Sequence, residues 1–246
     1  MDLSIVIPAF DESGKITRDV EAAAAFLKGE NLSGEIIVVD DGSRDDTAAA
    51  AKETNIPPDV HLNVIRCDPH RGKGYAVRTG MAASHGEYVM FADSGGCVPY
   101  ENALRGLDML KSGVCELAHG SRKLRESSIQ RRQAWYRRIL SRVFRWVVIR
   151  AMKLPAGLTD TQCGFKMYRG DVARTLYGAC ITDGFMFDVE IIMRASRANY
   201  RIREFPIEWT SDRDSRLSLV RSAGRVLLEL LTIRRTLRQR GGQPLT

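Results

Sequence analysis

The stretch EIIVVDDGS (35–43) decides the fold, because an uninterrupted apolar run ends there in two acids and a glycine turn. Apolar runs of this length without polar alternation are typical of strands buried on both faces of a sheet. The alanine-rich segment DDTAAAAKE (45–53) comes next and is expected to be helical. The sequence therefore predicts a strand–turn–helix unit with carboxylates at the carboxyl end of its strand.

The same unit recurs through the first 122 residues. Predicted strands cover residues 3–8, 35–43, 62–67, 87–93 and 115–122. Helical patterns separate them, as in KITRDVEAAAAFLKG (15–29) and GKGYAVRTGMAAS (72–84). Repeated strand–helix units predict an α/β fold, a Rossmann-like and mainly parallel sheet with helices on both faces. Ligands of such sheets bind at the carboxyl ends of the strands. The polar residues at those ends are Asp11, Glu12, Asp40, Asp41, Asp93 and Arg122.

Composition restricts the kinds of partner. The 246 residues carry a net charge of +7, with arginine and lysine crowded into 122–153 and 213–240, which favours an anionic partner. We do not expect nucleic acid, because the basic stretches lack a recognition-helix pattern and the acids at the strand ends would repel a phosphate backbone. The odd count of five cysteines and the lack of a CxxC pair favour a reducing, cytoplasmic setting. No signal peptide or membrane-spanning apolar run is apparent.

The second half of the chain has a different character. We expect a long helix over 131–154 with seven arginines, a helix over 187–200 and a final strand over 201–209. Another basic amphipathic helix is expected over 216–240, and the tail 241–246 should be disordered. The two basic helices have the composition of helices that lie in a membrane interface. Core packing with a solvated basic face explains the same pattern.

Three segments have the chemistry of a nucleotide site. HRGKGYAVRTG (70–80) places Lys73 between two glycines at a helix start, where backbone N–H groups suit phosphate, although a solvated glycine turn fits equally. Asp41 could accept a hydrogen bond from a base N–H, and the alternative is a helix cap made by Ser43 or Asp45. Asp93 could bind a divalent cation that bridges two phosphates.

Eight motifs together resemble the family 2 glycosyltransferases, and within them the dolichyl-phosphate glucosyltransferases and polyprenyl-phosphate mannose synthases. The motifs are SIVIPAFDES (4–13), IIVVDDGSRDDT (36–47), RGKGYAVRTGM (71–81), YVMFADSGG (88–96), GSR (120–122), DTQCGFKMYR (160–169), GFMFDVEIIMRA (184–195) and EFPIEW (204–209). The spacing of DTQCGFK and FDVE is specific to the polyprenyl-phosphate branch. The resemblance implies the type A glycosyltransferase fold in a single domain over 1–240. It also implies a nucleotide-sugar half (1–122) and an acceptor half (123–240).

The resemblance also implies a role for individual residues. The base and ribose would lie against Pro8, Ala9, Glu12 and Asp41, and Asp40 is a further predicted substrate-binding residue. The lipid phosphate and the donor diphosphate would be held by Lys73, Arg122, Arg131 or Arg132, and Arg216, although the family usually has lysine near Arg216. The sugar end would be shaped by Asp160, Gln162 and Asp188. The predicted catalytic residues are Asp93, Arg122 and Asp188, with Asp93 as the ligand of Mg²⁺ or Mn²⁺.

One position departs from the family. Its motif is usually Asp-x-Asp, and here it is Asp93-Ser94-Gly95, so one metal ligand is missing. Asp93 with phosphates and water could suffice, another residue such as Ser94, Cys97 or a distant carboxylate could replace the ligand, or transfer could be lost. Cys97 is a poor candidate because thiolate is soft and Mg²⁺ is hard. We favour a working enzyme with a weakened metal site.

The predicted function is inverting transfer of a hexose from a nucleotide diphosphate sugar to a polyprenyl or dolichyl phosphate at the cytosolic face of a membrane. UDP-glucose is the first expectation for the donor and GDP-mannose the second. Peripheral binding to an anionic membrane surface is expected. The alternatives are a transferase with a soluble acceptor and a binding-only relative without turnover. The sequence does not indicate an oligomeric state.

Overall fold

The structure is a computed structural model that describes residues 1–129, 148–152, 154–155, 157–210 and 219–239. Its strands are β1 (Leu3–Ala9), β2 (Gly34–Asp40), β3 (His61–Arg66), β4 (Tyr88–Ala92), β5 (Leu117–Ser121), β6 (Ser128–Ile129), β7 (Phe165–Arg169), β8 (Ile202–Pro206) and β9 (Glu208–Trp209). Its helices are α1 (Ile16–Gly29), α2 (Thr47–Lys52), α3 (Lys73–Ala82), the 3₁₀ turn η1 (Tyr100–Asn102), α4 (Ala103–Lys111), α6 (Gly170–Gly178), α7 (Phe187–Arg197) and α8 (Leu219–Gln239).

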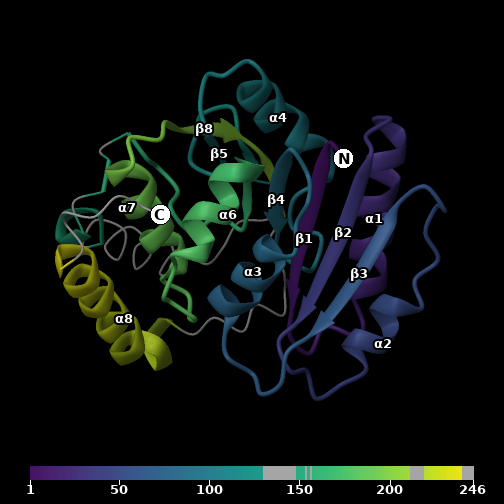
Figure 1. Cartoon of the computed structure of the whole chain (residues 1–246), viewed down its shortest axis with the longest axis horizontal. Coiled ribbons are helices and arrows are strands. Elements are labelled where there is room, and N and C mark those ends of the chain that lie inside the picture. Colours follow the sequence, from purple (N-terminus) through teal and green to yellow (C-terminus); the bar gives the residue numbers. More distant parts are fainter. Residues whose placement is uncertain (130–147, 153, 156, 211–218, 240–246) are drawn as a thin grey trace.

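Seven strands form one sheet in the order β3-β2-β1-β4-β7-β5-β8 (Figure 1). All neighbouring pairs are parallel except those of β7, which runs antiparallel to β4 and β5. The predicted mainly parallel α/β sheet is therefore confirmed, with one reversed strand. Strands β7 and β8, which come from the chain beyond residue 122, are hydrogen-bonded into this same sheet.

Both faces of the sheet are covered, because side chains alternate along each strand. On β1, Ile5 and Ile7 pack with α1 and α4, while Val6 points to the opposite face with α3, α6 and α7. Helix α3 comes unusually close to β1 at Gly80, where a Cβ atom would lie 2.3 Å from Cγ1 of Val6. Only glycine permits this approach without a shift of α3.

The structure differs from two predictions about the second half of the chain. The predicted single strand over 201–209 is wrong, because it is divided into β8, in the main sheet, and β9, which pairs with β6. Pro206 ends β8, and proline cannot donate to a continuing ladder. The predicted basic helix over 216–240 is observed as α8 from Leu219, and its buried side packs beside α7 (Figure 1). Most of the predicted helix over 131–154 and the tail 241–246 lie outside the described residues.

Candidate functional site

The candidate site lies where β1, β2, β4 and β5 end. Because β7 is antiparallel, its starting end lies at this same edge and brings the 160–164 loop there. The N-terminus of α7 lies at the same edge, because Asp188 in its first turn contacts Lys166 near the start of β7. The predicted site residues that the structure describes therefore gather at one edge of the sheet.

Pro8 and Ala9 end β1 beside the end of β2, where Ala9 is the register partner of Asp40. Asp40 is fully buried, and its Oδ1 accepts the Ser43 N–H at 2.9 Å. Its Oδ2 has no hydrogen-bond partner within the described residues, and the Arg66 guanidinium is 3.9 Å away. Asp40 therefore shapes the turn after β2.

Asp41 holds the loop that opens α3. Its side chain is buried, and its two oxygens accept the backbone N–H groups of Arg71 at 3.0 Å and Gly72 at 2.7 Å. The Nδ1 atom of His70 is 2.8 Å from Oδ2 of Asp41, and the centroid of the His70 ring is 4.1 Å from that of Phe10, with the ring planes tilted by 33°. Asp41 thus fixes the 70–72 loop, and His70 in turn contacts Phe10 of the first loop, which the sequence did not predict. The role of Asp41 toward a base stays a prediction.

The first loop is fixed to the turn after β2. Asp11 has a left-handed backbone with φ of 50°, and its N–H donates to Ser43 Oγ at 2.8 Å. Its Oδ1 accepts the Arg44 N–H at 2.7 Å, and the Glu12 N–H donates to Thr47 Oγ1 at 2.8 Å. Glu12 therefore lies beside the DDGS turn, where the resemblance places the base and ribose.

Lys73 and Asp93 form the centre of the site. The Lys73 ammonium is 2.6 Å from Oδ1 of Asp93, whose N–H donates to the Gly164 carbonyl at 2.8 Å. A Cβ on Gly164 would lie 2.0 Å from Cγ of Asp93, so this side chain requires glycine beneath it. Burial lowers the pKa of Lys73, but the charges of Asp93 and Asp188 outweigh it and leave the pKa above its usual 10.5. Lys73 is therefore charged at neutral pH.

Asp188 in the first turn of α7 is paired with Lys166 of β7. Their Nζ–Oδ1 distance is 2.5 Å, both side chains are buried, and Lys166 also donates to the Thr161 carbonyl at 3.0 Å. Burial raises the pKa of Asp188, and the charges of Lys166 and Lys73 oppose that effect without cancelling it. Lys166 was not among the predicted site residues, although a lysine inside the apolar strand FKMYR was a signal.

Arg122, at the end of β5, is engaged by Asp160. Its Nε and Nη2 atoms lie 2.6 and 2.8 Å from the two carboxylate oxygens, which is a bidentate pair. Burial would raise the pKa of Asp160, but the hydrogen bonds and charge of Arg122 keep it below its usual value. Glu204 accepts the N–H groups of Thr159 at 2.8 Å and Asp160 at 2.7 Å and so positions the pair. Sequence reasoning missed Glu204.

Gly95 has a left-handed backbone with φ of 97°. Its N–H donates at 2.6 Å to Oδ2 of Asp19, a carboxylate on the buried side of α1. Burial raises the pKa of Asp19 to about 6, and the hydrogen bond from Gly95 opposes this shift. Asp19 was not predicted as part of the site, although an acid between Ile16 and Val20 on an apolar helix face was a signal.

Asp93 is the predicted metal ligand, and one of its oxygens is paired with Lys73. The described residues contain no cluster of three or more His, Cys, Asp or Glu side chains suited to hold a metal. Gln162 lies in the 160–164 loop with Nε2 4.0 Å from Sδ of Met186. The remaining predicted phosphate ligands, Arg131, Arg132 and Arg216, lie outside the described residues.

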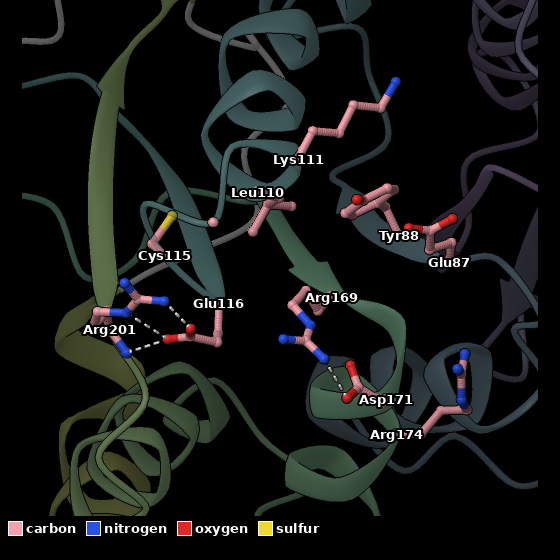
Figure 2. A pocket seen from close by; sticks show the side chains of 11 residues that line it. Glu87, Tyr88, Leu110, Lys111, Cys115, Glu116, Arg169, Asp171, Arg174 and Arg201 are labelled. Carbon is pink, nitrogen blue, oxygen red and sulfur yellow. Dashed lines mark hydrogen bonds and ion pairs between the residues drawn. The ribbon is translucent and has the colours of Figure 1, made fainter.

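A pocket lies at the opposite edge of the sheet, where β4, β5 and β8 begin (Figure 2). It is lined by both acids and bases, and several of them are paired with one another. Arg169 is 2.9 Å from Asp171, and Arg201 donates to Glu116. The carboxyl edge, and not this pocket, therefore combines the predicted catalytic residues.

Residues 4–177 match the model of the family described as glycosyl transferase family 2. The chain belongs to this family. It is 31% identical over 252 residues to the dolichyl-phosphate beta-glucosyltransferase of Saccharomyces cerevisiae, covering 94% of this chain and 74% of that protein. It is 30% identical to the human protein of the same name, covering 87% of this chain and 69% of that protein. The chain is therefore a glycosyltransferase, as predicted.

Comparison with solved structures identifies the fold. Glucosyl-3-phosphoglycerate synthase from Mycobacterium tuberculosis, in complex with Mn²⁺, UDP and glucosyl-3-phosphoglycerate, superposes with a TM-score of 0.70 at 18% identity. The match covers 94% of this chain and 79% of that one. The same enzyme has also been solved with Mg²⁺ and UDP, again with a TM-score of 0.70. The likeness confirms the predicted type A glycosyltransferase fold.

Proposed function

We propose that the protein transfers glucose from UDP-glucose to a polyprenyl phosphate of the dolichyl type, with inversion at the anomeric carbon. The observation that carries this proposal is the row of charged pairs at the carboxyl edge, Lys73–Asp93, Lys166–Asp188 and Arg122–Asp160. The names of the relatives that are about 30% identical over most of the chain support glucose and a dolichyl phosphate. GDP-mannose is the second candidate donor.

The reaction needs little proton chemistry. A phosphate monoester carries a charge of about −1.5 to −2 at neutral pH, so the acceptor oxygen is already a nucleophile. It attacks the anomeric carbon, the bond to the donor diphosphate breaks, and the nucleotide diphosphate leaves with the electron pair. The protein has to bring two anions together and orient them. Lys73 and Arg122 are the described cations at this edge that we assign to this task.

We assign the nucleotide to the 1–122 half and the acceptor to the 123–240 half. In this assignment the base lies near Asp41 and the diphosphate near Lys73 and Asp93. Asp188, fixed by Lys166, faces the sugar. When a Mg²⁺ or Mn²⁺ ion binds, Asp93 is the residue that would hold it, beside the positive charge that Lys73 already supplies.

A membrane surface is the proposed location of the acceptor, and α8 is the proposed contact. Its Val226, Leu230, Ile233 and Leu237 are buried against α7. On its other side Leu227, Leu228 and Leu231 are 58%, 67% and 54% exposed, near the exposed Arg225, Arg235 and Arg238. Exposed leucines flanked by arginines suit the interface of an anionic bilayer. Among the residues that the structure describes, no helix combines the length and apolarity needed to cross one.

Liposome flotation tests the membrane contact. Replacing both Leu228 and Leu231 by serine should reduce co-flotation with vesicles that contain anionic lipid, since it removes exposed apolar area without touching the buried face. Exposed Val114, on the loop before β5, serves as the matched control when it is replaced by serine. Equal flotation of the leucine variant and the wild type would reject α8 as the contact.

Transfer itself is tested by incubating the protein with radiolabelled UDP-glucose or GDP-mannose, polyprenyl phosphate and Mn²⁺. The proposal expects label from UDP-glucose in the lipid fraction, and it expects Asp188→Asn to reduce that label strongly. Transfer only to a water-soluble phosphate would favour the soluble-acceptor alternative. Nucleotide binding without any transfer would favour the binding-only alternative.

A further inference from the structure

The charge at Asp93 is already balanced by a residue of the chain. Lys73 is the first residue of α3, and its ammonium lies 2.6 Å from Oδ1 of Asp93. The Lys73 side chain is 22% exposed and that of Asp93 is 37% exposed, so the pair reaches the solvent edge of the site and is not enclosed in the core. The negative charge of Asp188 acts on Lys73 as well.

Gly95, at the position of the missing second carboxylate, forms a turn that is held by hydrogen bonding. Gly95 has φ of 97°, a conformation that side-chain-bearing residues rarely adopt, and Gly96 follows with φ of 60°. The Gly95 N–H is bound by Asp19 at 2.6 Å, so the turn is fixed by a carboxylate from α1. Asp19 is 3% exposed. The turn therefore has its own stable geometry, and it presents no acid side chain at Gly95.

We infer that the Lys73 ammonium supplies at Asp93 the positive charge that a divalent cation provides in a two-carboxylate site, so that a nucleoside diphosphate binds this protein without metal. This inference rests on the proposed function, because it concerns how the same site binds its donor. An ammonium has three N–H donors, so Lys73 can contact Asp93 and a phosphate oxygen together. Without Lys73, the Asp93 carboxylate would repel the diphosphate, and a divalent cation would be required between them.

Calorimetric titration with UDP, in EDTA and in MnCl₂, tests this inference. The wild type should bind UDP with dissociation constants that agree within about threefold in the two conditions. Lys73→Met should bind at least about tenfold more weakly in EDTA, and Mn²⁺ should recover part of the loss. Lys73→Arg keeps the charge and should stay close to the wild type in EDTA. Lys111→Met, an exposed lysine of the opposite pocket (Figure 2), is the matched control.

The outcomes separate the inference from the proposed function. If the wild type binds UDP in MnCl₂ but loses about tenfold or more in EDTA, the inference is wrong and the proposed function stands. If Lys73→Met binds UDP as the wild type does in EDTA, the inference is also wrong. If neither UDP nor GDP binds in either condition, the proposed function fails together with the inference. Circular dichroism and thermal unfolding confirm that each variant is folded.

Discussion

The buried pair of Lys166 and Asp188 makes the sharpest prediction about the site. Its side chains are 1% and 5% exposed, and its Nζ–Oδ1 distance is 2.5 Å. Removing one partner of such a pair leaves an uncompensated buried charge, which costs about 3–5 kcal/mol. For a chain of this size 1 kcal/mol corresponds to about 2–4 °C in Tm. We therefore expect Lys166→Met to lower the Tm by about 10 °C.

The assay is thermal unfolding followed by circular dichroism, with chemical denaturation as a second measure of the free energy of unfolding. The double variant, Lys166→Met with Asp188→Asn, removes both charges and should recover most of the loss, because no buried charge is left alone. The coupling between the two single substitutions should exceed about 1 kcal/mol. A loss below about 1 kcal/mol for Lys166→Met, or simple additivity of the two changes, would refute the reasoning. Lys111→Met should leave the Tm almost unchanged.

Two further predictions concern the turn after β4. Burial raises the pKa of Asp19 from 3.8 to about 6. The Asp19 carboxyl therefore binds a proton more tightly in the folded protein than in the unfolded chain, and the protein loses stability as the pH rises from about 4 to about 6. Asp19→Asn should therefore raise the free energy of unfolding by about 2–3 kcal/mol at pH 7.5, and this gain should vanish below about pH 4. Chemical denaturation at several pH values measures it, and a gain that does not change with pH would contradict the prediction. Gly95→Asp should lower stability by about 1–3 kcal/mol because φ is 97°, whereas an unchanged Tm would mean that the turn adapts.

The sequence predicts the strands and the edge where the site lies more reliably than it predicts the contacts inside the site. Asp41 and Asp93 follow apolar runs, so their places at strand ends were predictable. The reversed direction of β7 was not, because β7 is buried on both faces like its parallel neighbours and lacks the alternation that is common in antiparallel strands. The pairing of Lys166 with Asp188 depends on that direction and on the packing of α7.

Contacts between distant segments were the other unpredictable part. Asp19 meets Gly95 across 76 residues, and Glu204 meets Asp160 across 44. Each contact joins two elements whose relative position depends on how the sheet and helices pack. The local sequence of either element does not indicate which distant element lies beside it. An unusual placement, such as that of Asp19 on the apolar face of α1, indicates that the side chain has a polar partner but not which residue supplies it.

A crystal structure of the protein soaked with UDP-glucose tests the central claim most directly. The account predicts the uracil beside Asp41, the diphosphate against Lys73 and Asp93, and the glucose toward Asp188. A nucleotide sugar bound in the pocket of Figure 2, or anywhere else away from Asp41 and Asp93, would contradict it.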